Sequence, residues 1–193
     1  MKVAILILAA GTSSRMGSIK QVLPYKHTTL LGWTIEQVIA VKEADTFVVL
    51  GANMGLIKKS IDAYSITIIE NKSYREGLST SIVTGINTIE VNTFDKVLIL
   101  LADQPKITTD YLKKLIEISK KNQAKIIASN YGDKIGVPAI FPKKYFSKLK
   151  ELTGDKGAGK LLNITLKSEV LSLLNSNLTD IDTLTNYHKL LKE

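Results

Sequence analysis

The sequence has no cysteine among its 193 residues and only two histidines, His27 and His188. Without cysteine there is no disulfide framework and no thiolate metal site. Neither histidine lies in a motif with a serine or aspartate partner, so a Ser-His-Asp hydrolase is not expected. This composition fits a cytoplasmic protein.

Long apolar runs are also absent, and none approaches the roughly 20 residues that span a bilayer. The N-terminus, MKVAILILAAG, carries little charge ahead of its apolar run, so we expect a buried first strand rather than a signal peptide. Lys and Arg outnumber Asp and Glu by 26 to 18. Because no zinc-finger, RRM-like or helix-turn-helix signature is present, this basic balance indicates a solvated surface or small phosphorylated ligands rather than nucleic acid or a membrane.

Strand-like apolar runs alternate with amphipathic helical patterns over the first two thirds of the chain. The predicted strands are 2–8, 46–50, 66–69, 96–101, 125–129 and 137–141, and the predicted helices are 28–41, 55–64, 79–89 and 108–121. Continuous apolar runs are typical of strands that are covered on both faces. The alternation indicates right-handed βαβ units, so we expect a three-layer α/β fold with a mainly parallel central sheet.

The last third is less regular. It predicts short helices at 142–149 and 157–163, a strand at 169–173 and a final helix at 183–192. The turn YGDKIG favours a hairpin around 131–141, which we expect to form a small lobe over the sheet. With no repeat, linker or low-complexity tract, residues 1–193 are expected to form one domain.

The opening stretch, LILAAGTSSRMGSIK, has the parts of an anion-binding loop. In an open α/β sheet, ligands bind beyond the carboxyl ends of the strands, which is where this loop lies. Small residues at Ala9, Ala10 and Gly11 let backbone N–H groups approach an anion. Arg15 offers a planar fork for phosphate oxygens, and Lys20 adds a second positive charge. The spacing matches neither the Walker A loop nor G-x-G-x-x-G, and an ordinary strand–loop connection is the alternative.

Two further segments follow predicted strands. In LILLADQPKIT, a carboxylate at Asp103 facing a phosphate-binding loop suits Mg²⁺, and a turn-capping aspartate is the alternative. In ENKSYREGLSTSI, Gly77 permits a tight turn, while Ser79 and Ser81 offer hydroxyls for a base or ribose edge. Ser79 acting simply as a helix N-cap is the alternative reading of that segment.

Acidic and basic residues also gather near the C-terminus. In TDIDT, strand alternation sends Asp180 and Asp182 the same way, so one can join Asp103 at a metal. The alternative is a pair of acidic residues that favour the start of the last helix. In GDKGAGKLL, the charged side chains are suited either to an anionic acceptor or to a polar loop. Transfer between phosphates needs positioning, metal and positive charge rather than a protein nucleophile, and this inventory matches that need.

Together, LAAGTSSRMGSIK, ENKSYREGLSTSI, LLADQPKIT, GDKGAGKLL and DIDT resemble, in this order, the motifs of the molybdenum cofactor nucleotidyltransferase-like family. The cytidylyltransferase branch looks most similar. The resemblance implies a Rossmann-like nucleotide-diphospho-sugar transferase fold. It also implies a Mg²⁺-dependent reaction that transfers CMP from CTP to the terminal phosphate of molybdopterin and releases pyrophosphate.

The resemblance also assigns roles by motif. Leu8, Ala9, Ala10 and Gly11 would line the nucleotide, Arg15 and Lys20 would neutralise its triphosphate, Gly77, Ser79 and Ser81 would face base and ribose, and Asp103 with Asp182 would hold Mg²⁺. Guanylyltransferase relatives usually read LAGG where this chain reads LAAG, which favours cytidine. Leu184 stands where the DIDT motif is usually followed by proline.

The acceptor stays open at this point. A GTP-using or sugar-phosphate nucleotidyltransferase of the same fold is one alternative, and a non-catalytic protein that binds and delivers a cofactor is another. A molybdoenzyme or cofactor-insertion protein is the partner that the resemblance implies.

Overall fold

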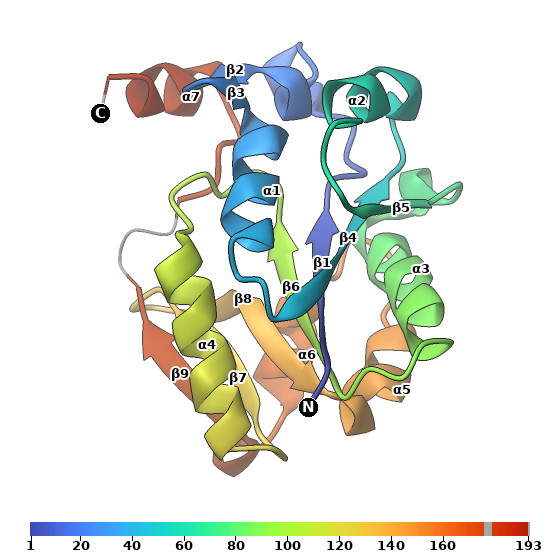
Figure 1. Cartoon of the computed structure of the whole chain (residues 1–193), viewed down its shortest axis with the longest axis vertical. Helices are drawn as coiled ribbons and strands as arrows, with labels where there is room; N and C mark the ends of the chain where they lie inside the picture. Colours follow the sequence, from blue (N-terminus) through green and yellow to red (C-terminus); the bar gives the residue numbers. More distant parts are fainter. Residues whose placement is uncertain (176–178, 193) are drawn as a thin grey trace.

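The computed structural model describes residues 1–175 and 179–192, and its centre is a seven-stranded sheet with helices on both faces (Figure 1). The strands are β1 (Val3–Leu8), β4 (Ala44–Leu50), β5 (Thr67–Glu70), β6 (Lys96–Leu101), β7 (Ile126–Asn130), β8 (Ile135–Pro142) and β9 (Val170–Leu174). Their order is β5-β4-β1-β6-β8-β7-β9, and within it only β8 runs antiparallel to its neighbours. The predicted three-layer α/β fold is confirmed.

The central strand β1 shows why the sheet needs two covering layers. All six of its residues are buried, and it pairs in parallel with β4 on one side and β6 on the other. Leu6 packs into a cluster with α3 (Leu78–Glu90), α5 (Phe146–Lys150) and α6 (Ala158–Ile164). Ile5 and Ile7 pack on the opposite face, with α1 (Leu30–Ile39), α2 (Met54–Ser60) and α4 (Thr109–Lys121). A run without polar alternation therefore marks a strand buried on both faces.

Threonine side chains cap the N-termini of three helices. Thr29 accepts a hydrogen bond from the Gly32 N–H at the start of α1, and Thr108 accepts one from the Tyr111 N–H at the start of α4. Thr183 does the same at α7 (Leu184–Leu190). Each cap satisfies a backbone donor that the first helical turn leaves without a partner. The helices predicted over 108–121 and 183–192 therefore start at the capping residues Thr108 and Thr183.

The hairpin of β7 and β8 differs from its expected position. It forms no lobe over the sheet, because β8 is inserted between β6 and β7 and pairs with both. Ala139, Ile140 and Phe141 are fully buried there. Burial of three consecutive side chains requires cover on both faces of the strand, which only the interior of the sheet supplies.

The C-terminal helix α7 lies at the same end of the molecule as the loop that follows β1 (Figure 1). A small hairpin of β2 (Pro24–Tyr25) and β3 (Thr28–Thr29) lies beside it. Met16, Ile181 and Tyr187 belong to one buried cluster, and the Tyr187 hydroxyl donates to the Pro24 carbonyl at 2.6 Å. The end of the chain thus holds the opening loop at the carboxyl edge of the sheet. No helix within residues 1–175 and 179–192 is long and apolar enough to cross a membrane.

Two helical glycines allow a matched test of this packing. A Cβ on Gly85 in α3 would lie 2.5 and 2.7 Å from the δ carbons of Leu6, whereas a Cβ on Gly55 in α2 meets nothing within 4 Å. We expect Gly85→Ala to destabilise the fold by about 1–3 kcal/mol through overpacking. Gly55→Ala should stabilise it by about 0.5–1 kcal/mol through helix propensity. Urea unfolding measures both, and a stabilised Gly85→Ala would contradict the packing of α3 on β1.

Candidate functional site

The loop after β1 is held in a fixed shape by one buried glutamine. Gln21 is 3% exposed, and its Nε2 donates to the carbonyls of Ala9 and Gly11, each at 3.0 Å. Its Oε1 accepts from the Ser13 hydroxyl at 3.1 Å. Ser13 and Gly17, both at positive φ, flank the short helix η1 (Ser14–Met16). Nothing in the sequence marks Gln21 as a site residue, because a glutamine within a polar loop gives no signal that it is buried.

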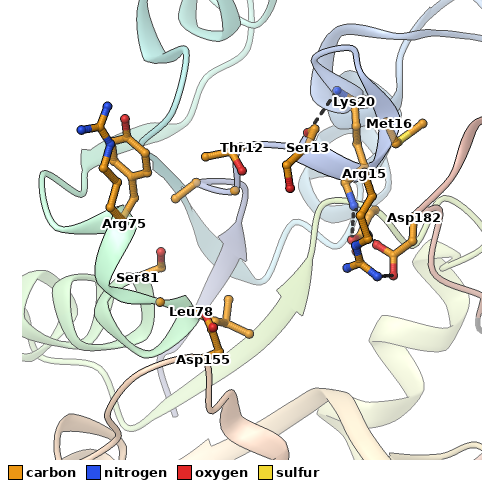
Figure 2. A pocket seen from close by; sticks show the side chains of 16 residues that line it. Thr12, Ser13, Arg15, Met16, Lys20, Arg75, Leu78, Ser81, Asp155 and Asp182 are labelled. Carbon is orange, nitrogen blue, oxygen red and sulfur yellow. Dashed lines mark hydrogen bonds and ion pairs between the residues drawn. The ribbon is translucent and has the colours of Figure 1, made fainter.

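An ionic cluster joins this loop to two other segments. The Lys20 Nζ lies 2.6 Å from Asp103 Oδ2, just after β6, and 3.3 Å from Asp182 Oδ1, just before α7. Arg15 lies 3.4 Å from Asp182 Oδ2 (Figure 2). The side chains of Lys20 and Asp103 are 16% and 17% exposed, while that of Arg15 is 75% exposed. The pair of Lys20 and Asp103 is therefore largely withdrawn from water, and Arg15 remains available at the surface.

Burial disfavours the ionised form of the Asp103 carboxyl. Burial raises the pKa of its carboxyl above the usual range, while the neighbouring Lys20 opposes that rise. Its Oδ1 is buried and has no hydrogen-bond partner among the described residues. The backbone carbonyl of the same residue accepts from the Ile181 N–H at 2.9 Å, which fixes the DIDT segment beside it. An unpartnered buried carboxylate oxygen is costly in the free protein and suits a ligand that brings positive charge.

The donor set of this cluster fits a hard divalent ion. Asp103 and Asp182 offer carboxylate oxygens, which Mg²⁺ and Mn²⁺ prefer. Groups of three or more His, Cys, Asp or Glu side chains suited to a metal do not occur in the part of the chain that the structure describes. That agrees with Mg²⁺ sites in which one or two carboxylates act together with substrate phosphates and water. The Lys20 ammonium contacts one oxygen of each carboxylate, Asp103 Oδ2 and Asp182 Oδ1, so a metal at those two oxygens would compete with it.

A cavity of about 760 Å³, here called the first cavity, opens beside the cluster. It is lined by residues from the opening loop, from the short helix η3 (Tyr74–Glu76) and the start of α3, and by three aspartates from later segments: Ala10, Gly11, Thr12, Ser13, Ser14, Arg15, Met16, Lys20, Tyr74, Arg75, Gly77, Leu78, Ser81, Asp103, Asp155 and Asp182. Figure 2 shows Arg75 on the opposite side of this cavity from Arg15 and Lys20. Positive side chains therefore lie on two sides of the cavity, as an extended anion requires.

Gly77 brings the wall of the first cavity close to the segment at Gly154. Its φ of +112° is unfavourable for a side chain, and a Cβ there would lie 2.3 Å from the carbonyl carbon of Gly154. The Ser79 N–H donates to the Gly154 carbonyl at 3.1 Å. Glycine at position 77 therefore permits the start of α3 to contact the GDKGAG segment, and this contact also places Asp155 in the lining.

The sequence-predicted residues divide into three groups. The first cavity is lined by Ala10, Gly11, Arg15, Lys20, Gly77, Ser81, Asp103 and Asp182. Leu8 lines a second, smaller cavity instead, and Ala9 and Ser79 line neither of these two. The Ala9 N–H donates to the Val49 carbonyl at 2.9 Å, so it belongs to the sheet and is not available to an anion. Ser79 is 1% exposed, so its hydroxyl lies inside the protein.

Other lining residues were not identified in the sequence. Thr12, Ser14, Tyr74 and Arg75 lie between or beside the predicted positions. Arg75 could have been predicted as a site residue, because it is a cation in the segment that follows a parallel strand. A buried amide also orders this side: Asn71 Nδ2 donates to the hydroxyls of Thr80 and Ser81, both at 2.9 Å.

The second cavity has a volume of about 280 Å³ and shares Leu78 with the first. Gln104 lines it, and its Nε2 donates to the Tyr131 hydroxyl and to Asp180 Oδ1, both at 2.8 Å. Burial raises the pKa of Tyr131 to about 12. Asp180 and Asp182 were expected to point the same way, but they line different cavities. Asp180 lines the second cavity and Asp182 lines the first.

Comparison with protein families gives one match over most of the chain. The model of the MobA-like NTP transferase domain matches residues 5–170. The purine catabolism protein PucB of Bacillus subtilis is 29% identical over 94% of this chain and 92% of its own length. The molybdenum cofactor cytidylyltransferase of Escherichia coli is also 29% identical, over 57% of this chain and 56% of its own length.

Solved structures agree with the fold. The crystal structure of Rv0371c from Mycobacterium tuberculosis H37Rv superposes with a TM-score of 0.86 and 25% identity, covering 100% of this chain and 99% of that one. A structure of the same protein in complex with manganese gives a TM-score of 0.79 at 24% identity and covers all of both chains.

The buried carboxyl of Asp103 predicts a pH-dependent stability difference. Because its pKa is raised in the folded state, stability is lost as the pH rises from the ordinary aspartate pKa of the unfolded chain to the raised value of the folded chain. Below the ordinary aspartate pKa of about 3.9, folded and unfolded chains are both protonated and the cost disappears. Asp103→Asn, which does not ionise, should therefore gain stability over the wild type as the pH rises from that range to neutrality.

Urea unfolding across this pH range in metal-free buffer measures the difference. Asp133→Asn, an exposed substitution of the same kind, controls for the loss of one negative charge. A stability difference for Asp103→Asn that stays constant or shrinks with rising pH would contradict the burial effect.

Proposed function

The chain belongs to the family of MobA-like NTP transferase domains, and on that basis we propose that it is a molybdenum cofactor cytidylyltransferase. The proposed reaction transfers CMP from CTP to the terminal phosphate of molybdopterin and releases pyrophosphate. Its family and fold are those of nucleotidyltransferases. The observation that supports nucleotidyl transfer is the cluster of Lys20, Asp103 and Asp182 at the edge of a cavity that has further cations on two sides.

The cavity suits a nucleoside triphosphate with its metal. Arg15 and Lys20 on one side and Arg75 on the other supply positive charge for the phosphates. Asp103 and Asp182 would hold Mg²⁺, which would neutralise charge on the phosphates and orient them. The manganese complex of Rv0371c supports a divalent ion on this fold.

The chemical step needs positioning rather than a protein nucleophile. An oxygen of the acceptor phosphate forms a bond to the α-phosphorus, the bond from that phosphorus to the α–β bridging oxygen breaks, and pyrophosphate leaves with those electrons. Once released from Asp103, the Lys20 ammonium would stabilise the negative charge that develops on the leaving pyrophosphate. Arg15 would contact the same phosphates. The first cavity would hold the reactants in line and limit access of water.

The base preference rests on one small residue. Ala10 is 5% exposed and lines the first cavity. A Cβ on the neighbouring Gly51 would lie 3.0 Å from the Ala10 Cβ, so this methyl group is closely surrounded. A methyl group where guanylyltransferases usually have glycine leaves less room for a base, which favours the smaller pyrimidine ring.

A second candidate differs in the acceptor. The match to PucB extends over more of the chain than the match to the cytidylyltransferase, so transfer to another phosphorylated acceptor on the same site is the second candidate. A cytoplasmic location and delivery of the product to a molybdoenzyme or cofactor-insertion protein belong to the same proposal.

Release of pyrophosphate tests the proposed reaction. With CTP, Mg²⁺ and molybdopterin we expect pyrophosphate release, and less of it with GTP, because Ala10 narrows the site. Asp103→Ala should lower the rate by about 100-fold or more, through loss of the charge stabilisation that a metal supplies. Turnover like that of the wild type in Asp103→Ala would refute the metal assignment. No release with any nucleotide and phosphorylated acceptor would instead favour a cofactor-binding protein.

The position of Lys20 predicts how metal binding depends on nucleotide. Because its ammonium occupies oxygens of Asp103 and Asp182, Mn²⁺ should bind the free wild-type protein weakly and bind better with a non-hydrolysable CTP analogue. Lys20→Met should bind Mn²⁺ without nucleotide about tenfold more tightly than the wild type, since the competing cation is gone. Electron paramagnetic resonance of free Mn²⁺ measures this, with Lys121→Met at the exposed end of α4 as the control. Equal affinities of Lys20→Met and wild type would contradict the competition.

A further inference from the structure

Two side chains of α1 hold the segment that follows β6 and carries Asp103. Trp33 Nε1 donates to the Pro105 carbonyl at 3.0 Å. Gln37 Oε1 accepts from the Thr109 N–H at 3.1 Å. Because residues four positions apart on a helix project from the same face, α1 presents both groups to this segment side by side. The chain that continues from Asp103 is thus fixed at two points by one helix.

The orientation of the Gln37 amide follows from chemistry. A backbone N–H only donates, so the atom of Gln37 that faces the Thr109 N–H has to be the amide oxygen. The Thr109 hydroxyl donates to the Gln37 carbonyl at 3.0 Å or to Oε1 at 3.1 Å. Thr109 is the first residue of α4, where a backbone N–H has no partner within the helix. Gln37 satisfies this donor and so joins the start of α4 to α1.

Trp33 also contacts the β2–β3 hairpin, which begins four residues after Lys20. The rings of Tyr25 and His27 meet the Trp33 ring edge-on, at centroid distances of 5.8 and 5.9 Å. The Lys26 ammonium lies over the same ring, 3.7 Å from its centroid. Edge-on aromatic contacts and a cation over an indole face both stabilise such packing. Trp33 therefore connects the segment after Lys20 with the segment after β6.

These contacts and the ion pair between Lys20 and Asp103 form a closed path. The two charges meet at 2.6 Å on one side of it, and Trp33 joins the same two segments on the other side. The path is short, since Tyr25 comes five residues after Lys20 and Pro105 comes two residues after Asp103. A displacement at Trp33 is therefore transmitted to the distance between the two charges.

We propose that Trp33 and Gln37 are positioning residues of the nucleotidyl transfer, which hold the Asp103 carboxylate opposite Lys20 and in place for the metal. The inference rests on the proposed function, because the metal at Asp103 belongs to that function. Neither Trp33 nor Gln37 lines the first cavity, so each acts through Asp103 and not on a substrate. Groups that orient a metal ligand change metal affinity by about tenfold or more when they are replaced.

Binding of Mn²⁺ to the full chain with a non-hydrolysable CTP analogue tests the inference without turnover. Trp33→Phe keeps an aromatic ring but loses the N–H donor, and Gln37→Leu loses the acceptor. We expect each to bind Mn²⁺ about tenfold more weakly than the wild type. Gln37→Glu keeps an oxygen for the Thr109 N–H and should bind within about twofold of the wild type. Electron paramagnetic resonance of free Mn²⁺ measures these affinities.

Tyr64→Phe is the matched control. The Tyr64 hydroxyl donates to Glu36 Oε1 at 2.8 Å, so this substitution also removes one hydrogen bond of α1 and keeps an aromatic ring. Its bond ends on α1 and not on the segment after β6, so Mn²⁺ affinity should equal that of the wild type. Wild-type affinity in Trp33→Phe or in Gln37→Leu would overturn the inference, as would an equal loss in Tyr64→Phe or in Gln37→Glu.

A thermodynamic cycle with Lys20 tests the positioning without metal or nucleotide. If Gln37 holds Asp103 at Lys20, Gln37→Leu also weakens the ion pair. Its effect on the unfolding equilibrium constant should then be about threefold smaller in the Lys20→Met background, and the same holds for Trp33→Phe. Tyr64→Phe should have the same effect in both backgrounds. Urea unfolding measures the cycle, with Asp103→Asn as the background if Lys20→Met does not fold. Effects of Gln37→Leu and Trp33→Phe that do not depend on the background would overturn the inference.

The two proposals fail in different ways. Coupling to Lys20 in the unfolding cycle, in a wild type that binds no Mn²⁺ with the CTP analogue, would refute the metal assignment and leave the role of Trp33 and Gln37 at the ion pair intact. Pyrophosphate release by the wild type, with unchanged Mn²⁺ affinity in Trp33→Phe and Gln37→Leu, would support nucleotidyl transfer and overturn the positioning role.

Discussion

The ion pair between Lys20 and Asp103 is the contact on which the geometry of the site depends. It joins the loop after β1 to the end of β6, across neighbouring parallel strands, at 2.6 Å. Asp182 completes the cluster from a segment nearly eighty residues further along the chain, with Lys20 at 3.3 Å. In water such a pair contributes little, but here both side chains are less than one fifth exposed. Its charges are therefore strongly felt by any ligand that enters, and the fold has to hold them in place.

Buried side-chain amides hold the segments around these charges in place. Gln21 fixes the opening loop, Asn71 fixes the hydroxyls at the start of α3, and Gln104 joins Tyr131 to Asp180. An amide can donate and accept at once, so one side chain can satisfy several groups of an irregular loop without adding charge. One amide thus holds together each of these three segments at the edge of the sheet. Asp103 differs from these amides, because it is a charged group in a buried position. Burial disfavours its ionised form, so the fold keeps there a charge that does not favour folding.

Much of the framework could be predicted from the sequence, whereas the interior of the site could not. The continuous apolar runs of β1 and β6 and the capping threonines at 108 and 183 are local signals, and the structure follows them. The insertion of β8 between β6 and β7 was missed, because strand order depends on contacts between residues far apart in the chain. Likewise the pairing of Ala9 with Val49 uses an N–H that the sequence suggested for an anion. The carboxyl-end rule located the site, but the partner of each buried amide follows only from the three-dimensional structure.

Residues 103–104 and 180–182 hold the two cavities next to each other. Two neighbouring residues of one segment and two alternate residues of the other divide between the two cavities, and one backbone hydrogen bond at Ile181 holds the segments together. A shift of either segment would displace both cavities at once, so their separation is set by the backbone rather than by flexible side chains. The charged side chains of the first cavity thus keep a fixed position, which is the condition under which positioning alone lowers the barrier to phosphoryl transfer. A protein that only delivered a ligand would not need its charges in a fixed position.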